Sequence, residues 1–209
     1  MTSLFSPDSR FFQILSRFSD LVILNLLFLI TSLPLFTVGA ASAAMYTLTF
    51  RMLRQKEEPI IRSYFRAFRQ NFRQGTALWL LFLLAAVPAL FYVDRFFTME
   101  SGLHMLFVPF LSVFVLAVLA AGFAFPLTSQ FQNSLIGTVR NALLLSLGNL
   151  PRAIAAAVLH LLPAGLFLFR YELFLQVSFL WVALYFSAAA YLSTAILWKV
   201  FKPFYPEEF

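Results

Sequence analysis

Four arginines, spaced three or four residues apart, are the strongest chemical feature of this 209-residue chain. On a helix of about 100° per residue they fall within an arc of about 60°, and four apolar side chains fill a second arc about 100° away. Guanidinium groups bind phosphates and carboxylates through paired hydrogen bonds. Residues 60–74 are therefore predicted to form a basic amphipathic helix on the cytoplasmic side, which binds anionic lipid or docks a partner, with plain anchoring as the simpler interpretation. The arginines are Arg62, Arg66, Arg69 and Arg73, and the apolar side chains are Ile61, Phe65, Phe68 and Phe72.

Other residues that could do chemistry are few. The sequence has no Cys and only two His, and it lacks the zinc-protease, phosphate-loop and nucleophile-elbow motifs. Asp94, Glu100 and His104 could bind a cation, although acidic residues near loops more often serve solvation. We therefore predict no catalytic residue, no metal site, no cofactor and no nucleic-acid partner, and we expect a protein that is not an enzyme.

The elements that must position the arginines are membrane spans. Hydrophobic residues make up 61% of the chain and charged residues 11%, against a charged share of about 25% in soluble domains. Apolar runs of this length, repeated along the chain, predict one all-α polytopic transmembrane bundle over residues 1–209. Pro34 and Gly39 break the first charge-free run into two helices. The predicted spans are 16–35, 38–54, 76–93, 105–127, 153–169 and 173–198, and 131–149 is a second interfacial segment.

The distribution of Lys and Arg predicts the orientation. With six spans, thirteen of the fifteen positive side chains lie on one side, which the positive-inside rule assigns to the cytoplasm together with both termini. A single crossing by residues 21–50 would give five spans and move Arg10 and Arg17 outside. A secretory signal ending near Ala43 is disfavoured, because cleavage there would carry seven positive charges across the membrane. The expected location is the plasma membrane, which is the inner membrane of a bacterial cell.

The predicted spans contain few residues that could support transport. Apart from Asp20 near the start of the first span, none has an acidic residue between its ends, so a carboxylate deep in a span, which commonly couples transport to protons or sodium, is missing. The function predicted is a non-enzymatic accessory or docking component. The alternative is a small-solute transporter or channel that acts as a homo-oligomer, with the Pro34 to Gly39 break along its path.

A set of positions in the first half of the chain is similar to a known family. The set comprises Asn25, the pattern Pro-x-x-Thr-x-Gly at Pro34, Thr37 and Gly39, and the run with Phe65, Phe68, Asn71 and Phe72. It resembles the YesL-like family of bacterial multi-pass membrane proteins, for which no biochemical activity is settled. The resemblance implies an accessory role in carbohydrate uptake or glycan utilisation, with a sugar-uptake transporter as partner. That implication is associational, since it depends on gene neighbourhood and not on any side chain.

Overall fold

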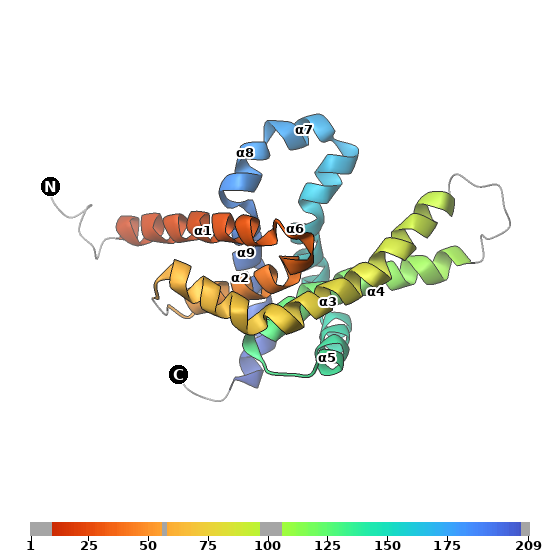
Figure 1. The fold of residues 1–209 in the computed structure, drawn as a ribbon, viewed down its shortest axis with the longest axis horizontal. Coiled ribbons are helices and arrows are strands. Elements are labelled where there is room, and N and C mark those ends of the chain that lie inside the picture. The colour runs from red at the N-terminus through yellow and green to blue at the C-terminus, as the bar shows by residue number, and fades with distance from the viewer. Residues whose placement is uncertain (1–9, 56–57, 97–105, 206–209) are drawn as a thin grey trace.

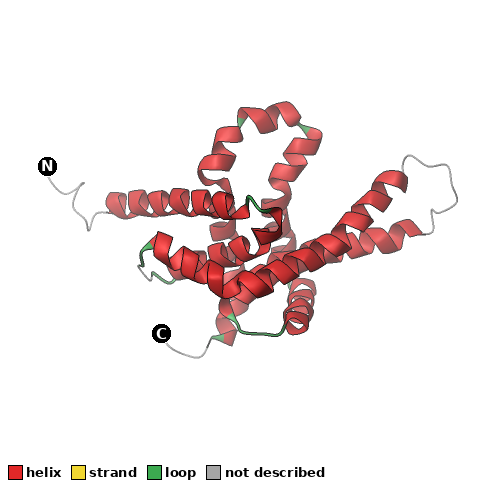
Figure 2. Ribbon diagram, in the orientation of Figure 1, coloured by secondary structure: helices red, strands yellow, loops and turns green. Residues whose placement is uncertain are grey.

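The computed structural model describes residues 10–55, 58–96 and 106–205. Within these ranges every regular element is helical and no strand is present (Figure 2). Five helical stretches there are long and apolar enough to cross a bilayer, so the predicted all-α membrane-helix class is confirmed. These stretches are Gln13–Ser32, Ile60–Tyr92, Phe107–Gln130, Leu150–Phe169 and Ser178–Phe204.

The helices divide into two groups of different direction (Figure 1). α3 and α4 form a long hairpin that extends to one side, and α6 and α9 cross the molecule in another direction. In chain order the elements are α1 (Arg10–Ser32), the 3-10 turn η1 (Leu35–Thr37), α2 (Val38–Leu53), α3 (Ile60–Phe96), α4 (Phe107–Gln130), α5 (Leu135–Gly148), α6 (Leu150–Phe169), α7 (Tyr171–Gln176), α8 (Ser178–Leu180), the π-helix η3 (Trp181–Tyr185), α9 (Phe186–Phe201) and the 3-10 turn η4 (Lys202–Phe204).

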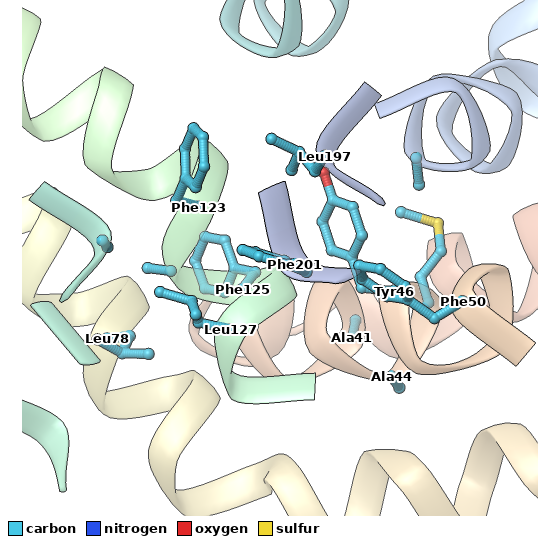
Figure 3. Close-up of a cluster of buried hydrophobic side chains, with 14 of the residues drawn as sticks. Ala41, Ala44, Tyr46, Phe50, Leu78, Phe123, Phe125, Leu127, Leu197 and Phe201 are labelled. Carbon is cyan, nitrogen blue, oxygen red and sulfur yellow. The ribbon is translucent and has the colours of Figure 1, made fainter. Parts of the chain in front are cut away.

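The centre of the fold is α2, which contacts α1, α3, α4 and α9. Its N-terminal half is a run of Gly, Ala and Ser, and such small side chains let neighbouring helices approach closely. Its second half supplies Tyr46 and Phe50 to the buried cluster that Figure 3 shows. Phe50 stacks on Phe201 of α9 with ring centres 5.7 Å apart, and Phe123 of α4 packs edge-on against the Phe201 ring. The small and aromatic halves of α2 thus hold four other helices around one element.

The break between α1 and α2 falls at the proline motif. Pro34 has an extended conformation, with φ −74° and ψ 105°, and ends the first helix. The Thr37 hydroxyl donates to the carbonyls of Thr31 and Pro34 at 2.5 and 2.6 Å, so the side chain satisfies carbonyl groups that the helix end leaves free. α2 has 16 residues, or about 24 Å of helix against about 30 Å of hydrocarbon. The choice between six spans and five therefore stays a prediction.

Three of the predicted boundaries differ in the structure. The sequence predicts an interfacial helix at 60–74 followed by a separate span at 76–93, but α3 is one helix of 37 residues. It stays continuous because Gly75 keeps a helical backbone and packs against α2, where a glycine is the only residue that fits. The span predicted at 173–198 is interrupted by a turn at Val177, and from Ser178 onward the helix is continuous through the π-helix η3. In the predicted interfacial segment 131–149, α5 begins only after Ser134, whose hydroxyl caps the helix.

Candidate docking face on α3

The N-terminal half of α3 is fixed to the bundle by one narrow face. Ser63, Tyr64 and Ala67 are buried, with Tyr64 fully enclosed. The Tyr64 and Thr31 hydroxyls lie 2.7 Å apart, which joins α3 to the end of α1. One turn further on, Gln74 donates to the Asn133 carbonyl at 3.0 Å and to the Thr138 hydroxyl at 2.9 Å. This half of α3 is therefore held rigidly by α1 on one side and by the start of α5 on the other.

The predicted arginines lie on the opposite face. On a helix, the centre of their arc is about 150° from the buried face. All four guanidinium-bearing side chains are exposed, and none forms a hydrogen bond or ion pair with another described residue. They therefore contribute no contact that holds the described fold together. We define the docking face as Arg62, Arg66, Arg69 and Arg73 with the two exposed phenylalanines beside them.

The three predicted phenylalanines do not share one environment. Phe65 and Phe72 are 48% and 37% exposed, so both lie on the outer surface next to the arginines. Phe68 is half-buried and packs against the core, with its ring centre 6.4 Å from that of Tyr64. Phe68 and Phe72 also meet edge-on at 5.6 Å. Two of the three rings can therefore reach lipid or a partner, and the third braces the helix.

An ion pair fixes the entry into α3. Arg51 at the end of α2 donates to Glu58 at 2.5 Å, and the Ser63 hydroxyl donates to the same carboxylate oxygen at 2.7 Å. The Ser63 hydrogen bond is the largest influence on the pKa of Glu58 and lowers it. Desolvation, the next largest, raises the pKa, and the positive charges of Arg51 and Arg66 lower it again, so that the pKa is lowered overall. The carboxylate therefore fastens the first turn of α3 to α2 in its charged form.

This ion pair makes stability depend on pH. Because the pKa of Glu58 is lowered by folding, its contribution is present above the unfolded-state pKa and is lost as the pH falls through the folded-state pKa. We expect Glu58→Gln to lower the thermal midpoint at pH 7 by a small amount, since the carboxylate is partly exposed. At pH 3 the difference from the wild type should shrink. Thermal unfolding of both proteins in detergent at the two pH values measures this, and an equal difference at both would contradict it.

Asn25 lies far from the docking face and is a structural residue in the bundle. Its side chain is fully buried and donates to the carbonyls of Trp181 and Val182 at 3.0 and 2.6 Å. Its amide oxygen accepts from the backbone N–H of Ser187 at 3.0 Å. These hydrogen bonds join α1 to the π-helix η3 and to the start of α9. A π turn disturbs the regular backbone ladder, and Asn25 supplies partners at that point.

The remaining positions of the family-like pattern lie between α1, α2 and α3. Gly39 is buried against Gly75, and the Trp79 indole N–H donates to the Leu35 carbonyl at 2.8 Å. The break from Pro34 to Gly39 is thereby filled by side chains and backbone of α3. Asn71 donates only to the Ala67 carbonyl of its own helix, at 2.9 Å. The contacts of Gly39 and Trp79 thus pack α3, the helix that carries the docking face, against the start of α2 and the turn before it.

Sequence reasoning missed the residues that tie the helix ends together. The Arg54 guanidinium lies 4.0 Å from the Tyr205 ring centre and 5.1 Å from that of Trp198. Arg54 and the Tyr205 hydroxyl both donate to the side-chain oxygen of Gln130, at 3.0 and 2.9 Å. Burial raises the pKa of Tyr205 although the cation is adjacent. These residues come from four separated segments, and no local spacing signals that they meet.

A second missed feature left a signal in the sequence. Ser63, Ala67, Asn71 and Gly75 follow one another at intervals of four, which is the small-residue spacing of a helix-packing face. This small-residue face is separate from the arginine arc and from the phenylalanine arc. It is the face that fixes the orientation of the other two.

Other polar groups show contacts typical of packing. His160 Nδ1 lies 2.7 Å from the Ala156 carbonyl, so that nitrogen donates and Nε2 accepts from the Tyr46 hydroxyl at 3.0 Å. Within the described ranges, no three His, Asp or Glu side chains gather closely enough to hold a metal ion. Glu100 and His104, two members of the predicted loop cluster, lie outside the described residues.

The long apolar helices, a core built on small residues and the exposed basic helix face define a polytopic helical membrane protein. Residues 21–95 match the model of a family described as "Protein of unknown function, DUF624", which includes YesL-like proteins. The matched part contains Asn25, the contact between Gly39 and Gly75, and the whole docking face. No curated protein and no solved structure matches the chain.

Proposed function

We propose that this protein is a non-enzymatic accessory component of the plasma membrane whose docking face binds an acidic segment of a partner membrane protein on the cytoplasmic side. The observation that carries the proposal is the exposed row of four arginines, none of which forms an ion pair within 4 Å with a described residue, on a helix whose opposite face is packed into the bundle. Because the helix backbone is already ordered, only the side chains lose conformational freedom on binding, and each guanidinium can form a paired hydrogen bond to a carboxylate.

The length of α3 supports a position for this face outside the hydrocarbon. Its 37 residues span about 55 Å, whereas the hydrocarbon is about 30 Å thick. When the apolar half of α3 crosses the membrane, the arginine half extends into the interface or the water beside it. The positive-inside rule then supports the cytoplasmic side, where anionic lipids give the same arginines a second binding partner.

The proposed link to carbohydrate uptake depends only on the resemblance of the first half of the chain to YesL-like proteins. Among the residues of that resemblance, Asn25 joins α1 to the π-helix η3, Gly39 packs α2 against α3, and Asn71 bonds within α3, and they carry no sugar chemistry of their own. A sugar-uptake transporter is therefore one candidate partner by association, and the docking face would recognise its acidic residues and not its substrate.

Two variants with the same four positions test the docking. One changes Arg62, Arg66, Arg69 and Arg73 to Gln, and the other changes them to Lys. We expect recovery of a stoichiometric, crosslinked partner from native membranes to fall about tenfold or more with Gln, and to fall less with Lys, which keeps the charge but not the planar fork. Recovery from the wild type should also fall as salt is raised before crosslinking.

The Lys variant is the matched control, because it keeps the charges that determine membrane orientation. A reporter active only in the cytoplasm, fused to the N-terminus, checks insertion of all three proteins. If the Gln variant is inserted correctly and recovers the partner as well as the wild type does, the docking proposal is wrong.

A further inference from the structure

A groove with a volume of about 750 Å³ lies between α6 and α9, away from the docking face. The two helices contact each other, and each supplies four residues to the walls. They lie next to each other in Figure 1, where α9 runs back along α6 after the arch formed by α7 and α8. The groove is open along one side and is formed by helices that are long and apolar enough to cross a bilayer.

Two cations lie at one end of this groove. Arg152 is in the first turn of α6 and Lys199 is in the last turn of α9, so the opposite directions of the helices bring them to the same end. The Arg152 guanidinium donates to the Asn149 side-chain oxygen at 2.7 Å, which orients it, and the Lys199 side chain is exposed. No carboxylate is among the residues that line the groove, so this charge is not neutralised there.

Beyond the cations the groove is wholly apolar. Its other lining residues are Ala, Val, Leu and Ile, and Val158 and Leu192 are 57% and 52% exposed. Val158 lies six residues after Arg152 and Leu192 lies seven residues before Lys199, which gives about 10 Å of apolar wall at 1.5 Å per residue. The arrangement is a positive end followed by an apolar channel along the direction of the helices.

We propose that this groove binds one anionic phospholipid, with its phosphate at Arg152 and Lys199 and the upper part of one acyl chain against Val158, Leu192 and Ile196. The charge and the shape favour this occupant together. A free phosphate would use the cations but leave the apolar wall in contact with solvent or lipid, and a zwitterionic lipid would bring its own cation to the positive end. Basic pockets between membrane helices bind anionic lipid headgroups in the same way.

The proposal is independent of the docking face. It uses two cations on α6 and α9, whereas docking uses four arginines on α3. A variant that loses partner recovery but keeps lipid binding, or one that loses lipid binding but keeps partner recovery, would therefore distinguish the two proposals.

Native mass spectrometry of the detergent-purified protein with added phosphatidylglycerol tests the site. The wild type should retain one phosphatidylglycerol per chain and bind it about tenfold more tightly than phosphatidylcholine. Arg152→Gln with Lys199→Gln should weaken phosphatidylglycerol binding about tenfold. The matched control, Arg140→Gln with Lys202→Gln, removes the same charge from two exposed positions outside the groove and should change the affinity less than about twofold.

A third variant separates lipid from free phosphate. Ala195→Phe fills the apolar wall from an exposed position, so the bundle need not repack. It should weaken phosphatidylglycerol binding and leave the binding of glycerol phosphate unchanged. Thermal midpoints near that of the wild type confirm that the variants fold. The proposal is wrong if glycerol phosphate binds as tightly as the lipid, if Ala195→Phe has no effect, or if the control pair loses as much affinity as the groove pair.

Discussion

Asn25→Leu is expected to lower the free energy of unfolding by about 2–4 kcal/mol, because it removes three hydrogen bonds to backbone groups where α1 meets the π-helix and the start of α9. The groups are the carbonyls of Trp181 and Val182 and the N–H of Ser187. Hydrogen bonds between membrane helices average about 0.6 kcal/mol, but groups at a π turn have no regular ladder to return to. The hydrogen bond from the Ser187 hydroxyl to the Leu21 carbonyl, at 2.7 Å, should weaken when these bonds are lost.

Two further substitutions distinguish the hydrogen bonds from the shape of the side chain. Asn25→Asp keeps the size and the acceptor for Ser187 but places an oxygen against two carbonyls, so it should be no more stable than Asn25→Leu. Asn71→Leu is the matched control, since Asn71 bonds only within its own helix and its loss should cost less than about 1 kcal/mol. Unfolding in mixed micelles, followed by tryptophan fluorescence, measures all three. Equal losses for Asn25→Leu and Asn71→Leu would contradict the assignment.

Gly39→Ala is expected to cost about 3 kcal/mol or more, because the backbones of α2 and α3 approach closely at this glycine. A Cβ atom at this position would overlap the Gly75 carbonyl oxygen and come within 2.6 Å of the Trp79 Cβ. Both neighbours belong to α3, so relief requires α2 and α3 to move apart, and that movement would disturb the core around α2. Gly75→Ala should be similarly harmful, because its Cβ would lie 2.8 Å from the Ala40 Cα.

Gly165→Ala provides the control for the glycine substitution. A Cβ at Gly165 meets nothing within 4 Å, and the residue lies inside α6. Since alanine is the better helix former by about 1 kcal/mol, this change should be neutral or stabilising. Thermal midpoints of the three variants in detergent measure the contrast. A Gly39→Ala protein as stable as Gly165→Ala would show that the helices do not meet at the glycines.

The sequence by itself determined the class of protein and the chemistry of its surface. A chain with 61% hydrophobic residues in long runs must satisfy its backbone within helices, so the all-α membrane class follows without any knowledge of contacts. The proline at position 34 predicts a break in the first run, and in the structure α1 ends two residues before it. The arginine arc on residues 60–74 follows from helical spacing alone, and all four side chains are exposed in the structure.

Only the tertiary structure decided which face of α3 is buried and which residues meet across the bundle. Gly75 remains within one long helix because Gly39 of α2 packs against it, and Asn25 finds a π-helix more than 150 residues away in the chain. Arg54 meets Gln130 and Tyr205 from other elements in the same way. Such pairings depend on how helices cross, which is set by the joint packing of all neighbours and not by the spacing of residues along any one segment.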